Sequence, residues 1–428
     1  MSRTEGYGNA FGDPSADIAR VGEIFEGTTL YLRRTFARGP VHSGWRQFLQ
    51  EDGPPSAAGT ACAIGSLVAM GVSPGDPQLI AARDFLFSAV CADGGWSKPR
   101  LADHFSLTMV TCLSLLALAR MGVSSEHAVL LGGLDWVVAA QNADGGWGNT
   151  SRDGQSDTTA TSYAIRALTV DDDARLRFGS VVEAGAGWVQ RQGDDDGAWG
   201  IRGGTVPTIA HTSHGVAALI AAGRPLESLH ASRAWLLARA RTDAPAAWLE
   251  HYSGSPRGGI ARADGPDDGA QPPLNAVVMR SERLRWTHLP AERALIALLS
   301  LGVDPSDEAV RRVARDTVGR HQDNAYWRVD SMPNTAPSWA IVEAVDALAR
   351  YRRRLEEVGQ ISWLKRINAG LVAEIADLRV GNSALLTAVE KLNGRLSALE
   401  SAGGDGPGAA GDAPDQGPAP AGTTEEPR

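Results

Sequence analysis

The stretch QNADGGW, residues 141–147, is the most informative part of the sequence, because close copies of it recur along the chain. The first four copies follow one another at intervals of 51, 51 and 52 residues, and two weaker copies come later. The copies end at Trp45, Trp96, Trp147, Trp199, Trp248 and Trp327. A fixed period of this length is typical of repeat proteins, in which neighbouring units bury one another's apolar faces.

Each repeat contains two helices of different character. The helix after each tryptophan, such as TMVTCLSLLALARMGV at 108–123, is apolar or small nearly all round, so we expect it to be buried on every side. The helix before each tryptophan, such as HAVLLGGLDWVVAAQ at 127–141, is amphipathic and is expected at the surface. Six helices of each kind predict an all-α fold, an α/α toroid of six helical hairpins over residues 15–352. An insertion at 249–286, rich in Gly and Pro, is expected to form a loop that could cover one rim of the toroid as a lid.

Composition and charge exclude several classes of function. The 428 residues carry 41 basic and 50 acidic side chains, and the net charge of -9 argues against nucleic-acid binding as the main activity. Hydrophobic residues make up 43% of the chain, so it is globular as a whole, with a flexible segment expected at 1–14 and a disordered tail at 401–428. The sequence shows neither a signal peptide nor a transmembrane run, which predicts a cytoplasmic protein for which peripheral membrane association stays open. Three cysteines without CxxC spacing are expected to be free, buried thiols.

A second pattern begins after the repeats. Leucine occurs every seventh residue from 364 to 399, and the positions three residues before these leucines are mostly β-branched residues or asparagine. Such a heptad predicts a coiled coil over 355–400 that pairs with a second copy of the chain or with another coiled-coil protein. The alternative is an amphipathic helix that folds back onto the toroid. The predicted interface consists of Ile361, Leu364, Asn368, Leu371, Ile375, Leu378, Asn382, Leu385, Val389, Leu392, Leu396 and Leu399.

The repeated phrase resembles the QW motif, QxxDGxW, of the terpenoid-cyclase and protein-prenyltransferase superfamily, and the resemblance covers roughly residues 15–352. In this motif the Asp-Gly pair supplies a turn with positive φ, the glutamine bonds nearby backbone, and the tryptophan seals one helix pair against the next. The resemblance implies an α/α toroid whose central cavity binds an isoprenoid. It is strong evidence for the fold and weak evidence for the chemistry.

Asp157 is the candidate catalytic residue. In the stretch QSDTTA, residues 155–160, it occupies the place of the middle aspartate of DxDDTA, which in acid-initiated cyclases of the family protonates an alkene. Gln155 and Thr158 replace the flanking acids, so the like-charge coupling that would raise the pKa of Asp157 is missing. The alternative is that Asp157 only caps the helix that follows it.

Other polar and aromatic residues are expected to share this cavity. Two histidines stand three residues apart in HTSHG and would lie on one helix face, but no cysteine and aspartate complete a prenyltransferase-like zinc set, so we predict no metal site. Mg²⁺ would be needed only with a diphosphate substrate. The predicted cavity residues are His211, His214, His288, Glu292, Trp286, Trp339 and Tyr163.

Two functions fit these patterns. The first is a terpenoid-cyclase-like protein that binds an isoprenoid and cyclises it with Asp157 as the proton donor, or, as a less favoured enzyme, a zinc-dependent prenyltransferase subunit. The second is a toroid that has lost its catalytic set and acts as a dimeric binding or scaffold protein.

Overall fold

The computed structural model describes residues 13–39, 42–97, 106–149, 155–241, 251–254, 260–262, 284–287, 289–322, 325–327, 329 and 335–402. The chain divides into two compact units, Met1–Gly359 and Gln360–Arg428. Predictions for residues 1–12, for the tail after 402 and for Trp248 therefore lie outside the described residues.

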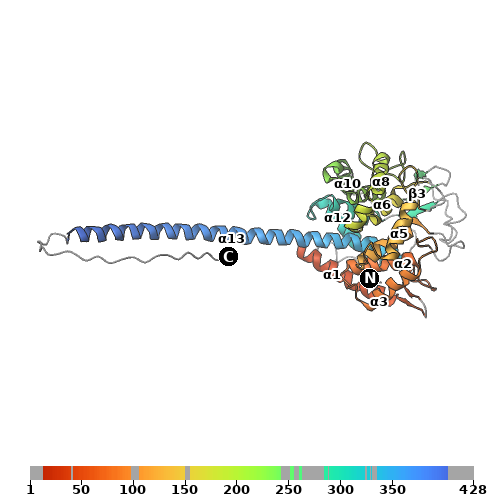
Figure 1. Ribbon diagram of the computed structural model, residues 1–428, viewed down its shortest axis with the longest axis horizontal. Coiled ribbons are helices and arrows are strands. Elements are labelled where there is room, and N and C mark those ends of the chain that lie inside the picture. Colours follow the sequence, from red (N-terminus) through yellow and green to blue (C-terminus); the bar gives the residue numbers. More distant parts are fainter. Residues whose placement is uncertain are drawn as a thin grey trace, which may run out of the picture. The chain divides into compact units, whose positions relative to one another are not determined.

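The first unit contains two sets of helices that form an outer and an inner ring, and Figure 1 labels several of them. The outer helices are α1 (Pro14–Arg34), α3 (Pro77–Ser88), α5 (Ala128–Ala139), α8 (Gly179–Gln192), α10 (His230–Ala240) and α12 (Glu308–Gly319). The inner helices are α2 (Ala57–Ala69), α4 (Thr108–Arg120), α6 (Thr158–Ala167), α9 (Ile209–Ala221), α11 (Pro290–Ser300) and the first turns of α13 (Ser338–Ala402). A short α7 (Asp172–Arg177) and the 3-10 helix η2 (Leu226–Leu229) precede outer helices. The predicted toroid is confirmed.

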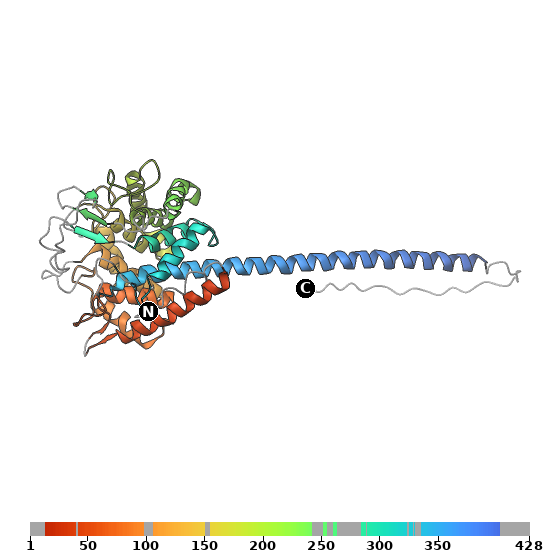
Figure 2. The same cartoon turned by 180° about the vertical axis from the view of Figure 1, so that it is seen from behind.

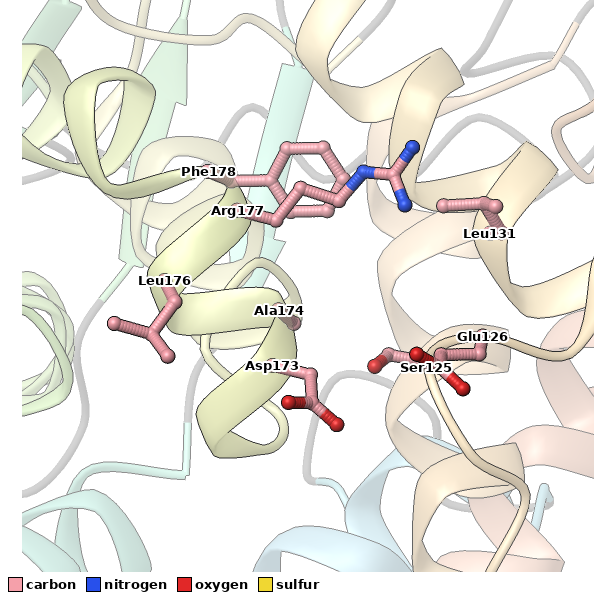
Figure 3. Close-up of a pocket in the computed structure, with 8 residues that line it drawn as sticks. All are labelled: Ser125, Glu126, Leu131, Asp173, Ala174, Leu176, Arg177 and Phe178. Atoms are coloured by element: carbon pink, nitrogen blue, oxygen red, sulfur yellow. The ribbon is translucent and has the colours of Figure 1, made fainter.

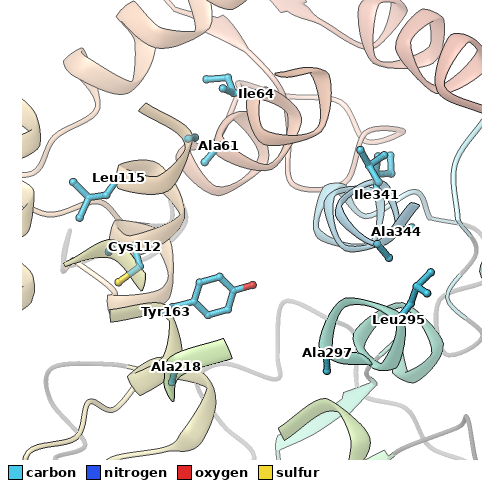
Figure 4. Close-up of a cluster of buried hydrophobic side chains, with 14 of the residues drawn as sticks. Ala61, Ile64, Cys112, Leu115, Tyr163, Ala218, Leu295, Ala297, Ile341 and Ala344 are labelled. Carbon is cyan, nitrogen blue, oxygen red and sulfur yellow. The ribbon is translucent and has the colours of Figure 1, made fainter. Parts of the chain in front are cut away.

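The burial of the two helix sets follows their sequence patterns. In α2 every residue from Ala57 to Leu67 is buried, as expected for a helix that is apolar or small all round. In α5 the buried residues are Leu130, Gly133, Leu134 and Val137, which form one stripe at helical spacing. The inner ring therefore supplies the largest share of the core, and Figure 4 shows some of its side chains.

The start of α13 closes the ring between α2 and α11. Arg120 on α4 forms an ion pair with Asp346 at 2.9 Å, and Arg293 on α11 forms one with Glu343. The loop before α13 is joined to the first repeat, since the N–H of Ser338 donates to the carbonyl of Gln47. The first turns of α13 also lie beside α1, where the Tyr351 hydroxyl donates to Asp17 at 2.8 Å (Figure 2).

The described repeat tryptophans are almost completely buried and are held by recurring bonds. The indole N–H groups of five of them donate to backbone carbonyls near the end of the preceding outer helix, at 2.7 to 2.8 Å. In the first four repeats the backbone N–H of the tryptophan also donates to the hydroxyl of the fourth residue of the next inner helix, at 3.0 to 3.1 Å. These hydroxyls belong to Thr60, Thr111, Thr161 and Thr212. Each of these four tryptophans thereby fixes the outer helix of its repeat to the following inner helix.

The aspartate of the motif joins successive repeats. Asp144 accepts from the indole N–H of Trp188 at 2.9 Å, and Asp93 accepts from that of Trp136 at 3.0 Å. Gly94 and Gly145 have φ of 91°, as the Asp-Gly turn requires. Gln141 donates to two backbone carbonyls at 2.9 and 3.0 Å, so the predicted roles of all three motif residues are confirmed.

The insertion contains strands, which the all-α prediction did not anticipate. Strands β3 (His251–Gly254), β4 (Ile260–Arg262) and β5 (Leu284–Thr287) form an antiparallel sheet in the order β4-β3-β5. A second, two-stranded sheet pairs β1 (Ala37–Arg38) with β2 (Ser43–Gly44). The Gly- and Pro-rich composition excluded a helix in the insertion but concealed the short strands.

In the second unit, α13 continues as one helix to Ala402, and its side chains up to residue 399 are exposed. No helix in the described part of the chain is both long and apolar enough to span a membrane.

The three cysteines lie in the first unit. Cys62 and Cys112 are buried free thiols as predicted, whereas Cys91 is only half-buried.

Candidate functional site

Asp157 stands at the N-terminus of the inner helix α6 and caps it. Its Oδ1 accepts a hydrogen bond from the N–H of Ala160 at 2.7 Å, and the residue is 8% exposed. Two other inner helices are capped in the same way by neutral side chains: Ser56 accepts from Gly59 on α2 at 3.0 Å, and Thr208 accepts from His211 on α9 at 3.1 Å. The capping role predicted as the alternative is therefore present, and it does not by itself require an acid.

Two motif loops hold the neighbours of Asp157. The N–H of Asp157 donates to the carbonyl of Trp147, and the Thr158 hydroxyl donates to the carbonyl of Gly200 at 2.7 Å. Ser156 donates to Asp144 at 2.7 Å and is thereby tied to the Asp-Gly turn of its own repeat. These hydrogen bonds fix the backbone on both sides of Asp157, at the rim where the inner helices begin.

The two histidines of α9 are both buried. His211 Nδ1 lies 2.7 Å from the Thr208 hydroxyl, and burial, with a smaller effect of Arg293, lowers the pKa of His211 to about 3. His211 is therefore neutral near pH 7. The ring of His214 lies 5.4 Å from that of Tyr163 on α6. Within the described ranges, no group of three His, Cys, Asp or Glu side chains is arranged to hold a metal ion.

A charged cluster extends from Tyr163 across the inside of the ring. The Tyr163 hydroxyl accepts from Arg293 on α11 at 3.2 Å, and Arg293 is also paired with Glu343 on α13. Arg166 lies over the Tyr163 ring, 5.1 Å from its centre. Figure 4 shows Tyr163 extending from α6 toward the interior of the ring. The inside of the toroid around Tyr163 therefore contains charged as well as aromatic side chains.

Sequence reasoning missed most of this cluster. Arg166, Glu343 and Asp346 lie in helices that are otherwise apolar, and a charged residue at a core position is rarely buried without a partner. Charged residues in otherwise apolar helices could therefore have indicated a cluster of paired charges. Asp346 is half-buried; its partial burial alone would raise its pKa, but Arg120 holds the pKa below its ordinary value.

Two of the predicted cavity residues, Glu292 and Trp339, have contacts different from those of His211, His214 and Tyr163. Glu292 is completely buried and forms an ion pair with Arg320, just after α12; burial raises its pKa, while Arg320 opposes this shift. Trp339 packs on a small cluster of Leu289, Val329 and Ala340. His288 is outside the described residues, and Trp286 is placed only as a residue of β5, opposite Tyr252.

Two cavities lie away from Asp157. One, of about 390 Å³, is lined by residues before and in α5 and by residues of α7 and its C-cap (Figure 3). These residues are Ser125, Glu126, Leu131, Asp173, Ala174, Leu176, Arg177 and Phe178. The other, of about 350 Å³, is lined by the last turns of α4 and α6 and includes Arg120, Arg166 and Arg175. Three guanidinium groups make the second cavity unsuited to an uncharged apolar chain.

Comparison with known proteins supports the fold and the repeat. The family model "Squalene-hopene cyclase C-terminal domain" matches residues 53–205. A squalene–hopene cyclase from Zymomonas mobilis is 26% identical over 156 residues, which represent 34% of this chain and 23% of that protein. The chain thus matches less than a quarter of the length of this relative.

Similar solved structures extend the likeness to the whole toroid. An arginine-to-alanine variant of the type II terpene cyclase MstE from Scytonema, in complex with geranylgeranyl dihydroxybenzoate, has a TM-score of 0.54 at 14% identity, covering 79% of this chain and 99% of that one. An α-amylase from Clostridium perfringens has a TM-score of 0.53 at 9% identity, covering 76% and 98%. Likeness at these identities shows the fold alone. The toroid is therefore similar to the terpenoid cyclase superfamily in its repeated motif, in the family model matched over residues 53–205 and in its ring of helices.

Proposed function

We propose that the toroid binds an isoprenoid and cyclises it, with Asp157 as the acid that starts the reaction. The observation that carries this proposal is the place of Asp157. It is a buried carboxyl group at the N-terminus of an inner helix, within the residues that match the squalene-hopene cyclase domain. The substrate class is supported by a protein of similar fold, a type II terpene cyclase whose structure contains a bound geranylgeranyl compound.

The proposed chemistry is a proton transfer followed by ring closure. The Asp157 carboxylic acid gives its proton to one carbon of a terminal C=C bond, and the other carbon becomes a tertiary carbocation. The next C=C bond of the chain attacks this cation and closes a ring. A water molecule takes a proton from a carbon next to the final cation, which forms a new double bond, and the resulting hydronium ion returns a proton to the Asp157 carboxylate. The product of a pure cyclisation has the same mass as the substrate.

A bound apolar chain would displace water from the rim at which the Asp157 carboxyl group lies, so that this group would face the substrate instead of solvent. Arg166 lies over one face of the Tyr163 ring, so a carbocation inside the toroid would be stabilised by this ring only at its opposite face.

The other capped helices supply the matched control for the test. Asp157→Thr reproduces the cap seen at Thr208 and Asp157→Asn keeps the shape of the side chain, but neither can donate a carboxylic acid proton. The wild type and these variants would be incubated with farnesyl diphosphate, geranylgeranyl diphosphate, squalene and geranylgeranyl dihydroxybenzoate, with and without Mg²⁺. Products would be separated and identified by mass spectrometry.

We expect the wild type to form an isomer of one substrate, and both variants to fold and form none. A product that persists in Asp157→Thr would exclude Asp157 as the acid.

The second candidate function, a binding or scaffold protein, is favoured by the neutral equivalents of Asp157 at Ser56 and Thr208 and by the charged Arg293–Glu343 pair inside the ring. Absence of product from every substrate with a folded wild type would support that candidate.

A further inference from the structure

The second unit presents a continuous apolar stripe that nothing in its own unit covers. The side chains at the predicted heptad positions between Ile361 and Leu399, other than the two asparagines, are between 50% and 71% exposed. In the toroid, by contrast, large apolar side chains of the described residues are exposed only singly, as at Leu176 and Val206. A stripe of this length is a protein interaction surface.

The helix is poorly suited to remain single. Gly370, Gly381 and Gly394 lie within it, and a β-carbon at any of them would meet no atom within 4 Å. Glycine inside an exposed helix lowers its stability, and isolated helices in water are marginal without tertiary packing. All three glycines fall outside the a and d positions, so they weaken the single helix without leaving gaps in a coiled-coil seam.

The two asparagines determine which partner fits. Asn368 and Asn382 both occupy a positions, 14 residues apart. In a parallel pair of identical, aligned helices each amide faces its own copy, and the two amides can bond each other inside the apolar seam. In the antiparallel arrangement that pairs Ile361 with Leu399, Asn368 would face Leu392 and would lose its hydrogen bonds on burial.

The charges flanking the seam fit the same partner. Glu374 is at a g position and Arg379 at the following e position, and these positions meet across a parallel two-stranded coiled coil. By symmetry this opposite-charge contact forms twice in a homodimer. Ile367 and Val372 occupy the equivalent positions one heptad earlier, where they would extend the apolar contact beside Asn368.

From the exposed stripe, the aligned asparagines and the flanking charges, we infer that residues 361–399 bind the same segment of a second copy of this chain as a parallel, in-register, two-stranded coiled coil. This inference is independent of the proposed cyclisation. It predicts a mass in solution of twice the 45.1 kDa of the chain.

The chain offers a closely matched pair of variants for the test. Leu378 is at a d position and 63% exposed in the single chain, and Val380, two residues later, is at an f position and 71% exposed. In a dimer, Leu378→Glu places two carboxylates against each other in the seam, while Val380→Glu stays in water. We expect Leu378→Glu to raise the dimer Kd by more than about 100-fold, and Val380→Glu to leave it within about threefold, by sedimentation equilibrium.

The direction of the helices is tested by cross-linking the full chain. Asn368→Cys should form an intermolecular disulfide under mild oxidation, because the two copies of residue 368 face each other in a parallel pair. The wild-type chain, with only its native cysteines, is the control. In the antiparallel arrangement the two copies would be separated by about 24 helical residues, or about 36 Å, and could not cross-link.

Four results would overturn the inference: a wild-type monomer at tens of micromolar, an equal effect of both glutamate variants, a mass of three or more chains, or no cross-link in the dimeric Asn368→Cys variant. Circular dichroism of Leu378→Glu adds a separate readout. Because helix formation is coupled to pairing, this variant should lose helical signal while the tryptophan fluorescence of the folded toroid is retained.

Discussion

Two adjacent glycines in α5 provide a sharp test of how the repeat tryptophans pack. A β-carbon on Gly133 would lie 2.7 Å from Cζ3 of Trp96 and 2.8 Å from a methyl group of Leu115. A β-carbon on Gly132 would meet no atom within 4 Å. Gly185 in α8 repeats the arrangement, since its β-carbon would lie 2.7 Å from Trp147. The glycine therefore lets the loop tryptophan pack directly on the outer helix.

The expected changes in the free energy of unfolding follow from these contacts. Gly132→Ala should increase the free energy of unfolding by about 0.5 to 1 kcal/mol, because alanine favours the helix and nothing opposes it. Gly133→Ala gains the same propensity but forces a methyl group against two fully buried side chains, which costs about 1 to 3 kcal/mol. We therefore expect the two variants to differ by about 1 to 3 kcal/mol, with Gly133→Ala the less stable.

Urea unfolding followed by tryptophan fluorescence measures the difference, with the wild type as reference. Equal stability of the two alanine variants, or a more stable Gly133→Ala, would show that the ring of Trp96 does not pack against Gly133. Direct contact between the loop tryptophan and the outer helix would then be excluded for this repeat.

The remaining predictions concern charged groups. Hydrogen bonds from Ser106, Trp136 and Gly95 outweigh the effect of burial and hold the pKa of Asp93 below its ordinary value. Stability from this group is therefore present above the unfolded pKa, near 4, and is lost as the pH falls through the folded pKa. Acid unfolding of Asp93→Asn should depend less on pH than that of the wild type, and identical profiles would contradict this. Arg293→Met or Glu343→Gln alone should cost about 3 to 5 kcal/mol, because each leaves a charged or polar partner buried in the ring. The double variant should cost less than the sum of the two, and simple additivity in urea unfolding would show that the pair does not interact.

The fold was predictable from the sequence because its determinants are local and repeated. The Asp-Gly turn, the tryptophan and the alternation of two helix types are all visible without knowledge of distant contacts. Partners far apart in the sequence were not visible. Thr60 and its three equivalents look like ordinary helix residues, and only the folded chain shows that each bonds the backbone of a motif tryptophan. The strands of the insertion were missed because glycine and proline obscure the alternation of a short strand.

The candidate site was predicted less completely than the fold. Spacing correctly placed Asp157 and His211 at the start of inner helices, since it depends only on the helix boundaries. Spacing could not give the direction of each side chain or its partner, so the pairing of Glu292 with Arg320 was not foreseen. The Arg293–Glu343 pair joins helices whose residues are 50 positions apart, and no local pattern connects them.

Running the reaction in D₂O tests whether Asp157 starts a cyclisation by protonating an isoprenoid. A proton-initiated cyclisation places one solvent-derived deuterium on the carbon that is protonated, so the wild-type product should be about one mass unit heavier than the product formed in H₂O. Asp157→Thr, which keeps the helix cap, should give no product at all. A wild-type product without deuterium, or a deuterated product from Asp157→Thr, would contradict the account.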